Sequence, residues 1–180
     1  MVVFLNVATF AKHWMGFDPI LLERAVSVAG SIVNYGAMQG WAVGMYANGS
    51  LPGSDQPIRV PAGRSPDQLM HILEALAAVT EFATGSIERM LFRESAGLPW
   101  AATMVLITAV VTEEIMINLI RLKEAGRRIV LISLANEPPP PFTGGITVYH
   151  LPATLPAFRK QSQDPTEAAL HNLVEQERKR

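Results

Sequence analysis

The sequence predicts an α/β fold in which helices flank a doubly wound, mostly parallel sheet and one more helix ends the chain. Short apolar runs alternate with longer segments that carry helix start signals, and this alternation is typical of right-handed β-α-β crossovers. Most of the runs are continuously apolar, as expected of central strands that are covered on both faces. Of the 180 residues, 49% are hydrophobic, which is enough to build the core of one domain.

Six segments are predicted strands. The five clear ones are Val2–Asn6, Trp41–Tyr46, Met104–Thr108, Ile129–Leu134 and Ile146–His150. A further strand is expected near Ile58–Val60, inside a turn-rich stretch. Asn48-Gly49-Ser50 is interpreted as a turn, because Asn-Gly dipeptides favour turns. If Val2–Asn6 and Met104–Thr108 are the adjacent central strands, their carboxyl ends form the ligand crevice of the sheet.

Helix boundaries are predicted from capping residues. The start signals are Asp18-Pro19, Ser65-Pro66-Asp67-Gln68, which has the form of a capping box, and Asp164-Pro165-Thr166-Glu167. Gly40 and Gly126 stand where helices that begin at Pro19 and Glu113 need left-handed stops. These signals predict an α/β domain over residues 1–155, followed by a linker and a C-terminal helix over residues 156–180.

Composition excludes several classes of function. The chain has 15 Lys and Arg against 16 Asp and Glu, so its net charge of -1 gives no field that would attract nucleic acid. It has no cysteine, which excludes disulfides, thiolate catalysis and cysteine-bound metals. Ala25–Ser54 is uncharged and long enough to span a bilayer, but its glycines and polar residues fit a buried helix and strand better. We therefore expect no transmembrane segment here and a cytoplasmic location.

The predicted crevice is poor in catalytic groups. It contains the segments Asn6-Val7-Ala8-Thr9-Phe10 and Thr108-Ala109-Val110-Val111-Thr112, with Thr84-Gly85-Ser86 as a third contribution. These segments offer hydroxyls and an amide but no carboxylate, histidine or cysteine before Glu113. General acid–base, nucleophilic and metal-assisted catalysis all need such groups. The sequence therefore favours a protein without catalytic activity and without a cofactor.

The same segments resemble the von Willebrand factor A-like domain, in particular the bacterial proteins of domain-of-unknown-function family fifty-eight. In that family an Asp-x-Ser-x-Ser motif, a Gly-Thr loop and a Ser-Asp motif form a metal-ion-dependent adhesion site. The matching residues here are Asn6, Ala8, Phe10, Ser86 and Ala109. The resemblance spans Val2 to Leu151 and implies a fold of the von Willebrand A-like, Rossmann-like kind. Because both aspartates and both serines of the first motif are replaced, the metal site is predicted to be degenerate and to bind no metal.

The resemblance also implies a context. Proteins of this family are encoded beside MoxR-type AAA+ ATPases and carry membrane helices ahead of the domain. It therefore implies a protein-interaction module that works with such an ATPase, with membrane association through a missing segment or a partner left open.

Large side chains mark the predicted partner site. Phe10, His13, Trp14 and Phe17 are dense on one expected loop, and Glu113 begins the helix on the opposite side of the crevice. Aromatic residues are enriched where binding energy concentrates. Two interpretations stay open: the cluster is an interface, or Trp14 and Phe17 fold back as a local core. The alternative function is a hydrolase or phosphatase of another doubly wound class that uses hydroxyls, Glu113 and a histidine; a membrane-associated subunit or an inactive fragment is a third reading.

Overall fold

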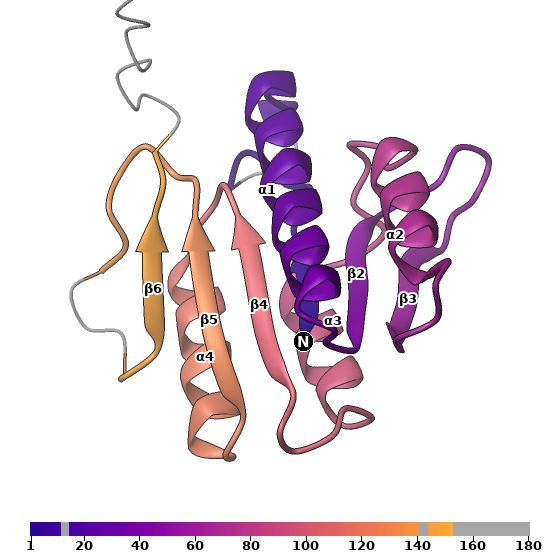
Figure 1. Cartoon of the computed structure of the whole chain (residues 1–180). Coiled ribbons are helices and arrows are strands. Elements are labelled where there is room, and N and C mark those ends of the chain that lie inside the picture. The colour runs from indigo at the N-terminus through magenta and orange to yellow at the C-terminus, as the bar shows by residue number, and fades with distance from the viewer. Residues whose placement is uncertain (12–14, 141–143, 153–180) are drawn as a thin grey trace, which may run out of the picture.

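The computed structural model describes residues 1–11, 15–140 and 144–152. Its centre is a six-stranded sheet with the order β3-β2-β1-β4-β5-β6 (Figure 1). The strands are β1 (Val2–Leu5), β2 (Val43–Ser50), β3 (Pro57–Gly63), β4 (Thr103–Thr108), β5 (Arg128–Ser133) and β6 (Thr147–His150). Only β3 runs antiparallel to its neighbour, so the predicted doubly wound, mostly parallel sheet is confirmed.

Helices cover both faces of this sheet. They are α1 (Pro19–Met38), α2 (Gln68–Ala77), α3 (Ile87–Ser95) and α4 (Glu113–Glu124). Figure 1 shows α1 and α2 on one face, with α3 and α4 on the other. The inward residues of α1 recur every three or four positions, at Leu21, Ala25, Ala29, Val33 and Gly36, so one stripe of the helix packs on the sheet.

Two apolar cores result, one on each face. Side chains alternate along a strand, so Val3 and Leu5 of β1 join the core under α1 and α2. Val2 and Phe4 of the same strand join the core with α3 and α4. All four residues of β1 are buried, which explains why the run is continuously apolar.

The predicted helix stops are confirmed. α1 ends at Met38 and α4 at Glu124, and the glycines that follow, Gly40 and Gly126, have φ angles of 72° and 86°. This left-handed conformation is readily adopted only by residues without a Cβ. The predicted start of α1 is also confirmed, because the Asp18 side chain accepts hydrogen bonds from the backbone N–H groups of Ile20 and Leu21.

Two local predictions are wrong. The capping box at Ser65 does not form, because α2 begins at Gln68 and the Gln68 amide donates to the carbonyl oxygens of Val43 and Pro61 instead. Gln68 thus ties the helix start to the edge of the sheet. The Asn48-Gly49-Ser50 segment is not a turn, since β2 begins at Val43 and continues to Ser50. The predicted C-terminal helix, Asp164–Arg180, lies outside the described residues, as does the proposed boundary at residue 155.

Candidate functional site

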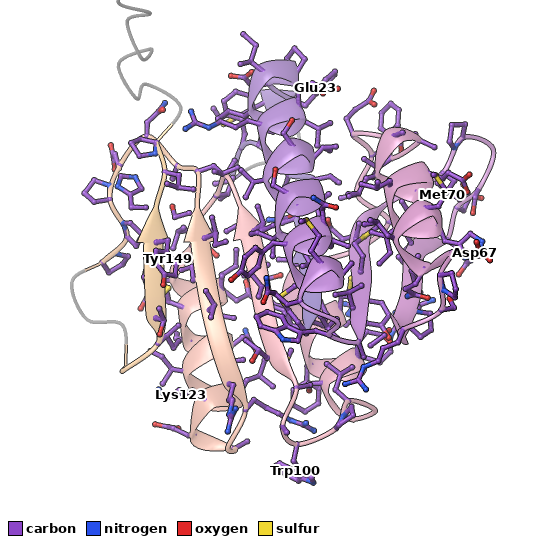
Figure 2. The ribbon with its side chains drawn as sticks, viewed as in Figure 1. Glu23, Asp67, Met70, Trp100, Lys123 and Tyr149 are labelled. Atoms are coloured by element: carbon purple, nitrogen blue, oxygen red, sulfur yellow. The ribbon has the colours of Figure 1, made fainter. Side chains whose placement is uncertain are left out.

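The candidate site lies where the sheet changes winding direction. β1 and β4 are adjacent and parallel, with Leu5 beside Ile107. The chain leaves β1 toward α1 on one face and leaves β4 toward α4 on the other (Figure 1). Their carboxyl ends therefore flank a switch point, which is where open α/β sheets hold their ligands. Figure 2 orients this edge: Glu23, in the first turns of α1, lies at the same end of the molecule, and Trp100 lies at the opposite end.

Three buried polar residues occupy the centre of this edge. Asn6 follows β1, Asn48 lies in β2 and Thr108 ends β4; they are 4%, 2% and 0% exposed. The Asn6 amide nitrogen donates to Thr108 Oγ1 over 3.0 Å, and the Asn48 amide nitrogen donates to Asn6 Oδ1 over 2.9 Å. The three side chains thus connect the ends of three neighbouring strands into one hydrogen-bonded group, which we call the polar centre.

The polar centre is also bonded to the backbone around it. Asn48 Oδ1 accepts from the N–H of Val7 over 2.9 Å, and the Asn48 amide donates to the Gly85 carbonyl over 3.2 Å. Asn6 Oδ1 accepts a second bond, from the N–H of Ala8. Thr108 Oγ1 donates to the carbonyl of Val110. Among the described residues, no buried side-chain nitrogen or oxygen lacks a hydrogen-bond partner.

This arrangement does not fit a divalent cation. Mg²⁺ and similar ions take oxygen ligands that are anchored by one or two carboxylates. The polar centre is neutral, and the side-chain oxygens of Asn6, Asn48 and Thr108 already accept hydrogen bonds from N–H groups. In the described ranges, no three histidine or acidic side chains gather as a metal site would require. The chemistry of the donor set therefore favours a structural role for these residues.

The structure brings together most of the residues that the resemblance matches to the degenerate metal site. Ala8 and Phe10 line one groove at this edge, and Phe10 and Ala109 line a second. Ala109 is buried, and Asn6 belongs to the polar centre. Ser86 follows Gly85, whose carbonyl accepts from Asn48, and the Ser86 hydroxyl accepts from the N–H of Arg89 and caps α3.

Sequence reasoning missed Asn48. The Asn-Gly-Ser tripeptide resembles a turn, but here it continues an apolar strand run past Ala47 and remains fully buried. A usable signal exists in the chain: an apolar run that ends in asparagine also occurs at Asn6, in the neighbouring strand. Buried asparagine side chains at matching positions of neighbouring strands can hydrogen-bond to one another. The repeated pattern would therefore have predicted that Asn6 and Asn48 form a pair.

An apolar rim lies beside the polar centre. Phe10, Phe17 and Phe82 line a groove of about 330 Å³, and we call these three residues the apolar rim. Phe82 is 70% exposed and Phe17 is 45% exposed, while Phe10 is half-buried. Phe17 therefore does not plug the crevice as a local core. His13 and Trp14 lie outside the described residues.

A second groove, of about 620 Å³, lies on the other side of Phe10. Its far wall is formed by Glu137 and Pro138–Pro140, in the connection after β5. Glu113, the last predicted partner residue, is exposed in the first turn of α4, after the N-cap Thr112. A carboxylate at this position stabilises the helix dipole.

One histidine and one serine that a hydrolase could use are hydrogen-bonded to the backbone of Ala135. His150 Nε2 is 2.8 Å from the carbonyl oxygen of Ala135, and the Ser133 hydroxyl accepts from the N–H of Ala135. These bonds hold the connection that leaves β5. Within the described parts of the chain, neither residue forms a hydrogen bond to a carboxylate.

Comparisons with known proteins provide structural likenesses but no sequence relative. No family model and no curated protein matches the chain. Among solved structures, the chain is similar to the manganese-loaded TRAP protein of Plasmodium vivax, with 13% sequence identity and a TM-score of 0.48. The match covers 84% of this chain and 68% of that chain. Across the described residues, no helix combines the length and apolar character needed to cross a bilayer.

Proposed function

We propose that the protein is a non-catalytic protein-interaction module, of the von Willebrand A-like kind with a degenerate metal site, that binds its partner through the apolar rim. The observation that carries this proposal is the exposure of Phe17 and Phe82 beside a groove at the carboxyl edge of the sheet. Large aromatic side chains that stay exposed around a concave surface are typical of binding sites.

The polar and the apolar side chains at this edge differ in what they offer to a ligand, and this difference supports a binding role. The polar groups of Asn6, Asn48 and Thr108 are engaged by one another and by the backbone, so they offer little to a substrate. The apolar rim is the part of the edge that gains most when a partner removes it from water.

The partner we propose is a MoxR-type AAA+ ATPase, in the cytoplasm, because the resemblance of the crevice segments implies one. The rim combines side chains from two parts of the chain, the loop after β1 and the segment between α2 and α3. Recognition would use apolar contacts and shape, without a bridging cation.

The test compares two matched sets of phenylalanines. We expect the tagged parent protein to capture the purified MoxR-type ATPase of its own source, and the double variant Phe17→Ala, Phe82→Ala to lose at least about tenfold in affinity. The control is Phe92→Ala, because Phe92 is 71% exposed on α3, as open as Phe82 but outside the rim. Both variants should keep the melting temperature of the parent, since exposed side chains contribute little to stability.

The proposed recognition surface would be wrong if the double variant and Phe92→Ala captured the ATPase equally well. The proposed partner would be wrong if the parent captured none, in the presence or absence of nucleotide. In that case the rim could still be examined by cross-linking, but not as an ATPase contact.

A further inference from the structure

A further concave site lies beside the apolar rim, and its character is basic. A cavity of about 260 Å³ is lined by Arg59, Arg89 and Arg93, and we call it the arginine cavity. Arg59 comes from β3, and the other two lie one helical turn apart on α3. Asn48 and Thr84–Ser86 line the same cavity, so it shares the α2–α3 connection with the rim.

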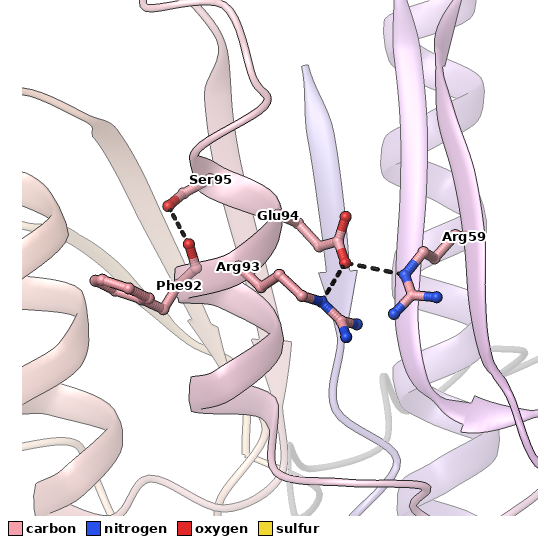
Figure 3. Close-up of polar contacts among 5 residues, drawn as sticks. All are labelled: Arg59, Phe92, Arg93, Glu94 and Ser95. Carbon is pink, nitrogen blue, oxygen red and sulfur yellow. Dashed lines mark hydrogen bonds and ion pairs between the residues drawn. The ribbon is translucent and has the colours of Figure 1, made fainter.

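One carboxylate holds two of the three guanidinium groups. Glu94 Oε1 accepts from Arg59 Nε and from Arg93 Nε, each over 2.9 Å (Figure 3). The Glu94 side chain is only 16% exposed, whereas Arg59 and Arg93 are 34% and 56% exposed. The carboxylate therefore lies behind the two arginines and positions them toward the open side.

Most of the guanidinium N–H donors in the arginine cavity remain available to bind a ligand. Both contacts to Glu94 use Nε, so the terminal amino groups of Arg59 and Arg93 are left over. Within residues 1–11, 15–140 and 144–152, those groups have no protein acceptor, and Arg89 forms no ion pair. Guanidinium forks of this kind recognise carboxylate and phosphate oxygens with two parallel bonds.

The charge balance of the cavity is positive. Three guanidinium groups face two carboxylates, those of Glu94 and Asp55, and Asp55 forms no ion pair within the described residues. Arg89 and Arg93 also repel one another, because like charges four residues apart destabilise a helix. An anion between them would remove that repulsion.

We propose that the arginine cavity binds a phosphate monoester. The three guanidinium groups approach from two elements, and a tetrahedral phosphate offers oxygens in several directions, whereas a planar carboxylate is already matched by one or two forks. Arginine clusters are a recurrent means of recognising phosphorylated groups. The ester can belong to a small metabolite or to a phosphorylated side chain, and the shared chemistry is the phosphate group.

The first experiment uses inorganic phosphate as the probe. In a ¹H–¹⁵N NMR titration at constant ionic strength, we expect saturable shifts of the Gly85 and Ser86 amides in the millimolar range. Arg89→Gln or Arg93→Gln should weaken binding about tenfold each, because each removes a charged hydrogen bond. Asp55→Asn should strengthen binding severalfold, since it removes the carboxylate that repels the anion. Arg121→Gln, on exposed α4 surface, is the matched control and should bind as the parent does.

The second experiment separates the two sources of the ester. Fluorescence anisotropy compares a labelled Ala-Ala-phosphoserine-Ala-Ala peptide with its serine and glutamate counterparts, and free phosphoserine competes with it. A peptide that binds at least tenfold more tightly than free phosphoserine points to a phosphorylated protein, and equal affinities point to a small phosphate ester.

Several results would overturn the proposal. These are the absence of saturable phosphate binding, shifts that persist in the Arg89→Gln, Arg93→Gln double variant, and a glutamate peptide that binds as tightly as the phosphoserine peptide. Arg89 forms no ion pair in the described part of the chain, so its variant tests the site even where changes at Arg93 disturb Glu94. The outcome does not depend on the apolar rim, because Phe17→Ala, Phe82→Ala should leave phosphate binding unchanged.

Discussion

Asn48 illustrates how an amide supports a strand end where a carboxylate would not. Its nitrogen donates to Asn6 Oδ1 and to the Gly85 carbonyl, and its oxygen accepts from the N–H of Val7. An asparagine supplies both donors and an acceptor, whereas an ionised aspartate supplies acceptors alone. At a site that is 2% exposed, the difference decides whether every partner is satisfied.

The amide should therefore be hard to replace. Asn48→Ala should lower the free energy of unfolding by about 1–3 kcal/mol, because it leaves the buried N–H of Val7 without an acceptor. Urea denaturation monitored by circular dichroism measures the change. Asn34→Ala, on the exposed surface of α1, is the control and should stay within about 0.5 kcal/mol of the parent.

Asn48→Asp should be destabilising in a pH-dependent way. The new carboxylate would face the oxygens of Asn6 and Gly85, so burial and repulsion should raise its pKa in the folded state. A raised pKa means that the variant is most stable below the pKa of an unfolded aspartate and loses stability as the pH rises through the folded value. Its deficit relative to the parent should shrink on acidification, and a deficit independent of pH would contradict the described hydrogen bonds.

Tyr46 provides a second pH-dependent prediction. Burial, with a smaller contribution from Glu94, raises the pKa of Tyr46 above 10.0, while Arg59 acts in the opposite direction. The stability that this shift contributes is complete below the unfolded pKa and is lost as the pH rises through the folded one. Urea denaturation between about pH 9 and pH 12 should show a smaller loss in Tyr46→Phe than in the parent. Tyr35→Phe, an exposed control, should follow the parent.

At the scale of elements, β2 organises the edge of the sheet. It continues to Ser50, and beyond Asn48 it contacts the α2–α3 connection through an isolated bridge between Gly49 and Ala83. The N–H of Thr84 donates to the carbonyl of Asn48 over 2.7 Å. These contacts place Phe82 on the rim side and Ser86 on the side of the arginine cavity.

Gly49 allows this close approach. A Cβ at this position would lie 2.7 Å from the carbonyl oxygen of Thr80 and 2.7 Å from Val7 Cγ1. Gly49→Ala should therefore lower the free energy of unfolding by roughly 1–3 kcal/mol, as overpacking does. Gly85→Ala is the control, because a Cβ there meets no atom within 4 Å. Equal melting temperatures for the two variants would contradict the described packing of the α2–α3 connection against β2.

The elements could be predicted from sequence to different extents. The central strands and the ends of α1 and α4 were predictable, because continuous apolar runs and the glycines at 40 and 126 are local signals. The start of α2 was not, because Gln68 bonds to the backbone of Val43 and Pro61, in the two neighbouring strands β2 and β3. The polar centre was only half predictable: Asn6 follows from the strand end, but Asn48 needs the partner strand in view.

At the scale of the whole molecule, the structural polar group and the two proposed recognition sites lie along one edge of the sheet. The side chains of the polar centre hydrogen-bond to one another at the switch point. The apolar rim and the arginine cavity lie on either side of the α2–α3 connection. A sequence analysis can place the strand ends beside one another. The hydrogen bonds that satisfy the polar side chains of the crevice, however, depend on three strands and on the α2–α3 connection. We propose that recognition at this edge uses no divalent cation.

A measurement of manganese binding can decide whether this edge holds a cation. Titration with Mn²⁺ under electron paramagnetic resonance measures free Mn²⁺, whose signal falls when the ion binds to protein. We expect the free signal to follow total Mn²⁺, with no site tighter than millimolar, because Asn6, Asn48 and Thr108 provide no carboxylate. A stoichiometric loss of signal at micromolar Mn²⁺ that disappears in Asn6→Ala would contradict the account.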